Sequence, residues 1–133
     1  MAISLEQIEI ALYQHLAGMI GVPPIAWPNK DANPVRPFLA VDHIPGSRDD
    51  PTLDGTGETV IGQLHVSVVV GENQFVTSAN ALADRVMARF AYKTRISFAS
   101  GVALVTKPPE VLAGYKDGPD FRVPVRVDYA VQT

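Results

Sequence analysis

The strongest constraint on the fold is an alternating segment in the middle of the chain, "TVIGQLHVSVVV" (residues 59–70). Its even-numbered positions are apolar or glycine, whereas the odd-numbered positions from Thr59 to Ser67 are mostly polar. Successive side chains of a β-strand point to opposite faces, so this pattern predicts a strand with one buried face. The closing segment "FRVPVRVDYAV" (residues 121–131) alternates in the same way. Pro124 within it has no N–H to donate, which predicts an edge position or an interrupted pairing.

Two other segments have the apolar spacing of amphipathic helices. In "ISLEQIEIALYQHLAG" (residues 3–18), Ser4 can cap the first turn and Gln7 stands where it completes a capping box. In "FVTSANALADRVMARFAY" (residues 75–92), Thr77 and Ser78 are the candidate caps. The second helix has a predicted buried stripe of Ala79, Leu82, Ala83, Val86 and Phe90.

The remaining strands are shorter. "FLAVDHI" (residues 38–44) reads as a strand that ends at Pro45. "TRISFA" and "VALVTK" (residues 94–99 and 102–107) read as a hairpin around Ser100 and Gly101. The proline-rich stretch at residues 22–37, which precedes the first of these strands, leaves room for at most a short strand at residues 25–27.

The order of these elements predicts the fold class. Strand pairs joined by short turns favour an α+β fold, with a mostly antiparallel sheet of about five to six strands. Two main helices are expected on one face of the sheet, and a long loop joins two of the strands. A chain of 133 residues suits a single domain, which we place at residues 1–133.

Composition narrows the classes of function. With 47% hydrophobic and 19% charged residues, the chain is expected to be globular rather than disordered. It has no cysteine, which excludes disulfide and thiolate chemistry. A net charge of −3 without any Lys/Arg cluster argues against tight binding to nucleic acid through its phosphates. No apolar run approaches the length of a membrane span, so we expect a soluble protein that does not contact a membrane.

The sequence contains no motif of enzymatic or cofactor chemistry. The glycines at 55, 57 and 62 precede a strand rather than a helix, which does not fit a dinucleotide or phosphate loop. The acids around Pro51 do not have the spacing of a calcium loop. The histidines, His15, His43 and His65, do not have metal-ligand spacing and read as surface or interface residues. We therefore expect no catalytic residue, no metal and no cofactor.

The long polar connection at residues 45–58 is the most unusual feature that remains. Connections of this length without their own secondary structure are usually functional or disordered. The second unusual feature is the polar face of the two long strands. The candidate functional residues in these two regions are Arg48, Asp49, Asp50, Leu53, Asp54, Glu58, Gln63, His65, Arg122 and Arg126.

Several segments, taken in order, resemble a known family. They are "IAWPNKDANPVRPFLAVDHIPG", the glycine-bearing polar loop, "GQLHVSVVVGEN", "ANALADRVMARF", "GVALVTKPPEV" and "FRVPVRVDYAV". In this order they resemble the tail-terminator-like proteins of long-tailed bacteriophages and related prophage elements. The resemblance covers nearly the whole chain, and that family has no catalytic motif to carry over.

The resemblance implies a structural virion protein in the tail, assembled in the host cytoplasm. Such a subunit forms a homohexameric ring on the head-proximal end of the tail tube, where it stops polymerisation and provides the joining surface for the head. Its implied partners are further copies of itself, the tail-tube protein and a head-completion protein, while DNA only passes through the lumen. In such a ring we expect the connection at residues 45–58 to contact an adjacent component, and the polar strand face either to pack on a neighbouring copy or to line the lumen. The alternatives are another head–tail connector or tail-tube protein and, less favoured, a small-molecule-binding domain or an enzyme.

Overall fold

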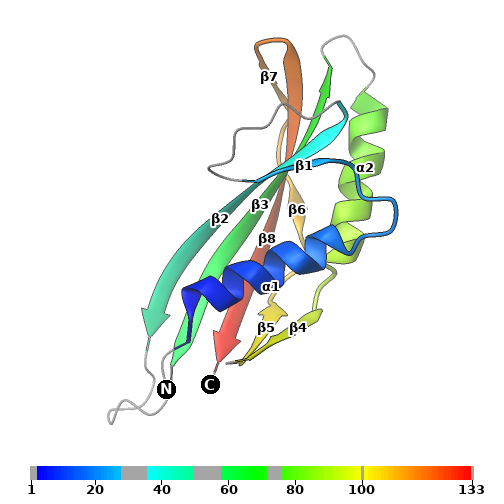
Figure 1. Cartoon of the computed structure of the whole chain (residues 1–133). Helices are drawn as coiled ribbons and strands as arrows, with labels where there is room; N and C mark the ends of the chain where they lie inside the picture. Colours follow the sequence, from blue (N-terminus) through cyan, green and yellow to red (C-terminus); the bar gives the residue numbers. More distant parts are fainter. Residues whose placement is uncertain (1–2, 28–35, 50–57, 72–75, 100, 133) are drawn as a thin grey trace.

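The computed structural model describes residues 3–27, 36–49, 58–71, 76–99 and 101–132. Two helices, α1 (Leu5–Ala17) and α2 (Val76–Arg89), accompany an eight-stranded sheet (Figure 1). The strands are β1 (Ile25–Ala26), β2 (Phe38–Asp49), β3 (Thr59–Gly71), β4 (Arg95–Phe98), β5 (Gly101–Val105), β6 (Glu110–Val111), β7 (Tyr115–Asp117) and β8 (Asp120–Gln132). The α+β class is thus confirmed, with more strands than the five to six expected.

The sheet is mixed. Its strand order is β1-β2-β3-β8-β5-β4, with β6 and β7 also paired to β8. β1 runs parallel to β2, whereas the other pairings are antiparallel. The expectation of a mostly antiparallel sheet did not include this parallel pair, because a two-residue strand in a proline-rich segment carries no signal of its direction.

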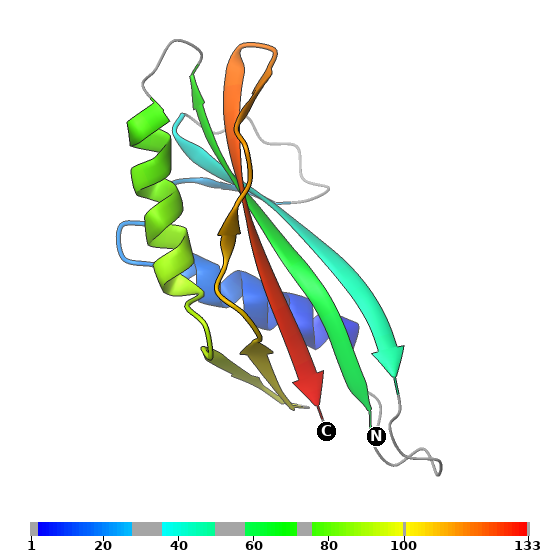
Figure 2. The same ribbon diagram turned by 180° about the vertical axis from the view of Figure 1, so that it is seen from behind.

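Strand β8 lies between β3 and an interrupted strand made of β5, β6 and β7. β3 pairs with β8 along its whole length, and β5, β6 and β7 follow one another along the other side (Figure 2). Pro124 lies opposite the gap between β6 and β7, where the Leu112 N–H donates to the Pro124 carbonyl at 2.9 Å. Because Pro124 cannot return an N–H, the pairing breaks there. The prediction of an interrupted pairing is confirmed.

Strand β2 is longer than predicted. It continues past Pro45 to Asp49 and pairs with β3 up to Thr59, after a register shift between Pro45 and Arg48. A β-bulge at a strand edge accommodates the proline. A Cβ on Gly46 would lie 2.1 Å from the Ile61 carbonyl oxygen, so only glycine permits this close approach. The predicted loop at 45–58 was therefore wrong in its first part, and its residues 45–49 belong to the strand.

The hydrophobic core is a single cluster that includes residues of both helices. α1 contributes Ile8, Leu12 and Leu16, and it crosses in front of β3 and β8 in Figure 1. The predicted stripe of α2 is buried at all its positions and joins the same cluster. From the sheet, the cluster takes Leu39, Val41, Val60, Leu64, Val66, Val68, Val70, Ala103, Val105, Val123, Val125, Val127, Tyr129 and Val131. The alternation read in the two long strands therefore identified their buried faces correctly.

The helix ends follow local chemistry. The Gln7 N–H donates to Ser4 Oγ at 3.2 Å, as predicted for the cap of α1. The caps predicted for α2 were wrong, because the helix already includes Thr77 and Ser78. Hydroxyl residues are also tolerated in a first helical turn, and the sequence alone does not distinguish the two positions.

Gly62→Ala should destabilise the protein. A Cβ at this position would lie 2.5 Å from Tyr129 Oη. The Tyr129 side chain is fully buried and its hydroxyl is bonded to His43, and overpacking of this kind costs about 1–3 kcal/mol. Urea unfolding followed by circular dichroism measures the change. Ser67→Ala, on the other face of the same strand, is the control and should change the free energy of unfolding by less than about 0.5 kcal/mol. Equal stability of the two variants would contradict this packing.

Candidate assembly surface

The sheet face opposite the core, here called the outer face, carries four of the predicted interface residues in adjacent rows. Gln63 pairs with Asp128, and His65 pairs with Arg126, across β3 and β8. Arg122 lies on the same face of β8, two rows from Arg126. Side chains at paired positions of neighbouring strands lie on the same face of a sheet. The structure therefore brings Gln63, His65, Arg122 and Arg126 together as expected.

Salt bridges and hydrogen bonds connect most of these polar side chains within the subunit. His65 Nε2–H donates to Gln63 Oε1 at 3.0 Å. Arg126 Nη2 donates to Glu110 Oε2 at 2.6 Å, and Arg122 Nε donates to Asp117 Oδ2 at 2.8 Å. The guanidinium groups of the outer face are thus oriented by acids of β6 and β7, so this face presents a fixed pattern of charge.

Arg48 and Glu58 form an ion pair where β2 and β3 leave the described part of the chain. The Arg48 guanidinium also donates to the Ile3 carbonyl at 2.9 Å, which links this end of the sheet to the start of α1. Of the other residues predicted on this connection, Asp50, Leu53 and Asp54 lie outside the described residues. The backbone of Asp49 is described as the last residue of β2, and its side chain is not.

A buried polar cluster between α1 and the sheet was missed by the sequence analysis. His43, predicted as a surface or interface residue, has a fully buried side chain. Its Nδ1–H donates to Glu9 Oε1 at 3.0 Å, because a carboxylate can only accept, and its Nε2 accepts from the Tyr129 hydroxyl. The sequence did contain a signal of this burial, because His43 is an odd-numbered residue of β2 like the buried Leu39 and Val41, and alternate residues of a strand share a face.

Burial keeps the Tyr129 hydroxyl of this cluster protonated. The pKa of Tyr129 is raised to about 12, mainly by desolvation and also by the nearby Glu9 carboxylate, while Arg48 acts in the opposite direction. The phenol is therefore neutral over the physiological range and remains a hydrogen-bond donor to His43.

A second histidine contact, which is partly buried, joins the two helices. His15 Nε2–H donates to the Arg89 carbonyl at 2.8 Å, and Arg89 Nε donates back to the His15 carbonyl at 2.7 Å. Desolvation lowers the pKa of His15, although the hydrogen bond to the Arg89 carbonyl acts in the opposite direction. His15 is thus a link between the ends of α1 and α2 rather than a free surface group.

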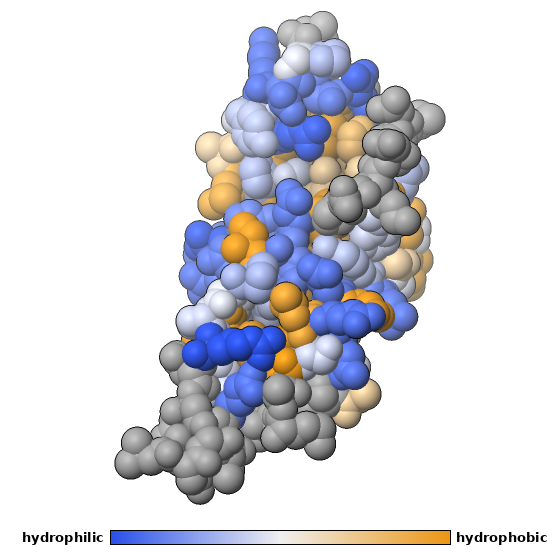
Figure 3. Space-filling view, turned by 60° about the vertical axis from the view of Figure 1, so that its left-hand side comes forward, coloured by the Kyte–Doolittle hydropathy of each residue, from blue (hydrophilic) through white to orange (hydrophobic). Residues whose placement is uncertain are grey.

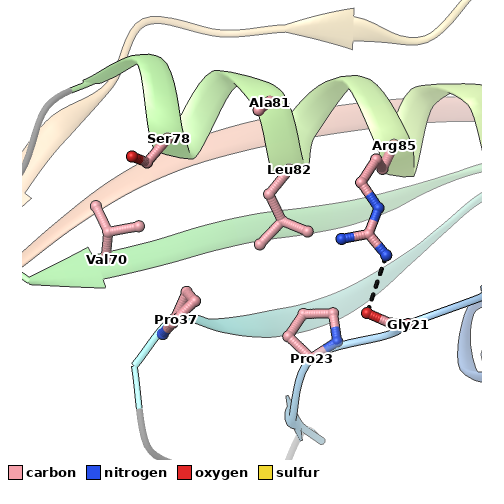
Figure 4. A pocket seen from close by; sticks show the side chains of 8 residues that line it. All are labelled: Gly21, Pro23, Pro37, Val70, Ser78, Ala81, Leu82 and Arg85. Carbon is pink, nitrogen blue, oxygen red and sulfur yellow. Dashed lines mark hydrogen bonds between the residues drawn. The ribbon is translucent and has the colours of Figure 1, made fainter.

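A hollow of about 370 Å³ lies beside α2, between this helix and the segment before β1 (Figure 4). Its polar lining residues are Ser78 and Arg85, and the Arg85 guanidinium donates to the Gly21 carbonyl at 2.9 Å. The rest of the lining is Gly21, Pro23, Pro37, Val70, Ala81 and Leu82. This lining offers neither a general base nor an activated nucleophile among the described residues.

Exposed apolar side chains lie at the edges of the sheet and also on its outer face, where Ile61 of β3 is 46% exposed. Ile44 of β2 is 45% exposed, and Val111 and Tyr115 of β6 and β7 are 41% and 49% exposed. Figure 3, which brings the β2 side of the molecule forward, shows separate hydrophobic spots in a mostly hydrophilic surface. Protein interfaces that form between soluble subunits commonly have this mixed character.

Metal ligands and membrane spans are absent from the described part of the chain. No cluster of His, Cys, Asp or Glu among these residues could hold a metal ion. Within the same residues, neither helix is long and apolar enough to cross a membrane.

A family model described as "Phage tail terminator protein" matches residues 7–129. The chain belongs to this family. The tail terminator also superimposes on a solved chain that carries no functional name, with a TM-score of 0.79 and 22% identity, over 99% of this chain and 98% of the other. A chain from the virion of a native gene transfer agent particle gives a TM-score of 0.61 and 17% identity, over 96% of each chain. At these identities the two matches show a shared fold. Among curated proteins, no sequence matches.

Family membership gives the described surface its context. A tail terminator is a structural component of the phage tail and therefore of a virion, and the family points to a protein without enzymatic activity. The fixed charges of the outer face and the exposed apolar residues at the edges are thus surfaces of a protein that assembles with other virion proteins.

Tyr129→Phe should destabilise the terminator by about 1–3 kcal/mol at neutral pH, because it leaves the buried His43 Nε2 without its donor. Urea unfolding measures this loss. Tyr115→Phe, which removes a half-exposed hydroxyl at the tip of the molecule, is the control and should have no effect. Equal curves for the two variants would contradict the buried hydrogen bond.

The ionisation of Tyr129 should make the stability of the fold fall at high pH. The pKa of Tyr129 is raised in the folded state, so its contribution to stability is complete below about pH 10 and is lost as the pH rises through about 12. Urea midpoints of the native protein should fall between pH 8 and 12. The part of this decrease that comes from ionisation of Tyr129 should be absent from Tyr129→Phe. Parallel profiles for the two proteins would contradict the raised pKa.

Proposed function

We propose that this protein caps the head-proximal end of the tail tube, stops tube polymerisation and provides the joining surface for the head. The observation that carries the proposal is the family match, which extends over almost the whole chain. The fold shared with a chain of a gene transfer agent virion supports it. Assembly takes place in the host cytoplasm, where tube and terminator meet.

The cap is proposed to be a ring of six identical subunits, as the resemblance implies, and its partners are the tail-tube protein and a head-completion protein. A ring of identical subunits needs a heterologous interface, in which two different surfaces of each copy meet. DNA passes through the lumen without specific contacts. The net charge of −3 is compatible with this role, because a passage for DNA does not need to hold the phosphates.

The connection between β2 and β3 is proposed to contact a neighbouring ring component. The described ends of this connection are fixed by the Arg48–Glu58 ion pair and by the Arg48 contact with Ile3. The connection therefore starts at one end of the sheet, beside the first residues of α1.

Shortening this connection should abolish termination but leave the fold intact. Asp49 and Thr59 already pair, so an Asn-Gly turn in place of residues 50–58 can close the hairpin. The circular dichroism spectrum should be unchanged, whereas tails assembled with the variant should be overlong in electron micrographs. A variant that keeps the length of the loop but has residues 50–57 in scrambled order tests whether its sequence matters. Tails of normal length joined to heads in the shortened variant would refute the role of this connection.

The alternative candidates are a head–tail connector and a tail-tube subunit. A tube subunit should form long polymers when concentrated, whereas a terminator should stop at closed rings or remain monomeric. Light scattering over a concentration series separates these outcomes, and negative-stain imaging of the protein mixed with tail tubes should show a cap at one end. Filaments, or protein bound along the whole tube, would refute the terminator role. The hollow beside α2 leaves a small-molecule-binding domain or an enzyme as the weakest candidate.

A further inference from the structure

Each of the two edges of the sheet has a stretch without a neighbouring strand in the described part of the chain. β2 is covered by β1 only at Leu39 and Ala40, so in the described part of the chain the edge from Val41 onward has no strand beside it. β4 is the last strand at the other edge and pairs only with β5. Figures 1 and 2 both show β2 and β4 at opposite sides of the molecule. Open strand edges are ready-made sites of pairing with another chain.

The open part of the β2 edge is short and well defined. The Leu39 N–H donates to the Pro24 carbonyl on the β1 side, and peptide groups alternate in direction along a strand. The peptide groups of Val41 and His43 therefore face the same open side. Pro45 has no N–H, and the bulge that follows it ends the regular edge.

The two edges carry opposite charge. Beside β2, Glu9 of α1 contacts His43, and Asp42 is exposed on β2 itself. Arg48, the basic residue of β2, lies beyond the bulge and is paired with Glu58. Residues 3–27 contain no Lys or Arg at all. At the other edge, Lys93 and Arg95 are exposed, and residues 91–106 contain no acidic side chain. Among the described residues neither Asp42 nor Arg95 has an ion-pair partner.

Asp42 and Arg95 also lie on the same face of the sheet. Asp42 pairs with His65, which pairs with Arg126 of β8, so Asp42 belongs to the outer face. Arg95 pairs with Leu104, which pairs with Ala130 of β8 and belongs to that face too. The two rows are four residues apart along β8, at positions 126 and 130. Closing a sheet into a ring requires a stagger of this kind between its edges.

We propose that the β2 edge of one copy meets the β4 edge of the next copy, with Asp42 facing Arg95 across the junction. The proposal rests on the ring described under the proposed function and identifies the contact that builds it. The occupant of each edge is a second copy of this chain, because the complementary edge is present in the same molecule with opposite charge. Such a contact is heterologous and therefore generates a ring or a helix rather than a two-fold dimer.

A charge-swap series tests the contact. Asp42→Lys and Arg95→Glu each place like charges across the junction, and each should raise the protein concentration needed for ring assembly at least about tenfold. The double variant D42K/R95E should restore assembly. An equal mixture of the two single variants should also assemble, because every junction between alternating copies then joins a basic side chain to an acidic one.

Asp84→Lys is the matched control, since it makes the same charge change on an exposed position of α2. It should assemble at the native concentration. Circular dichroism of each variant confirms that it is folded. Native assembly of the single variants, or failure of both the double variant and the mixture, would overturn the proposed contact.

Cross-linking gives a readout that does not depend on tails. The native chain has no cysteine, so introduced thiols are the only ones present. Ile44 and Ser97 lie on the outer face with the same stagger of four residues, at rows 128 and 132 of β8. I44C/S97C should give a ladder of disulfide-linked oligomers under oxidation, whereas D84C/S97C should not.

The two levels of the proposal fail in different ways. The absence of a ladder in I44C/S97C would overturn the edge-to-edge contact even if the native protein terminates tails. A ladder from a protein that does not terminate tails would support the contact and refute the terminator role instead.

Discussion

The structure depends on the pairing of β3 with β8. The two strands are paired from Thr59 with Gln132 to Gly71 with Asp120, without a register shift. Their inward-facing valines supply the largest part of the core that both helices contact, and their outward-facing residues supply the polar rows of the outer face. A slip of one residue would exchange these two sets, so the hydrophobic alternation fixes the core and the surface at the same time.

The sequence predicted best where periodicity was strong and uninterrupted. The alternation in β3 and β8 and the stripe of α2 gave the correct buried residues, because burial on one face leaves a regular pattern. The predictions failed where a long-range contact overrides a local signal. Pro45 reads locally as the end of a strand, but the bulge and the close approach of Gly46 to Ile61 carry β2 onward.

The candidate site was predicted only in part, because alternation along the long strands is visible in the sequence but contacts between distant segments are not. Gln63, His65, Arg122 and Arg126 share a face by parity alone, so the sequence was sufficient to group them. The short strands β6 and β7, which hold Glu110 and Asp117 beside these arginines, have too few residues to show a period. The parity of His43 along β2 indicated its burial, but its partners Tyr129 and Glu9 are distant in the sequence, and only the folded chain brings the three together.

The brevity of the open β2 edge has a consequence for the timing of assembly. On the proposed contact, only the peptide groups of Val41 and His43 are offered before Pro45 interrupts the edge. A junction with so few backbone hydrogen bonds has a low intrinsic affinity, so single copies remain apart while they are dilute. On the proposed function, copies held together on the last ring of a tube would have an effective concentration higher by orders of magnitude, at which the same weak junction closes. The tube would thereby be the template on which its own cap forms.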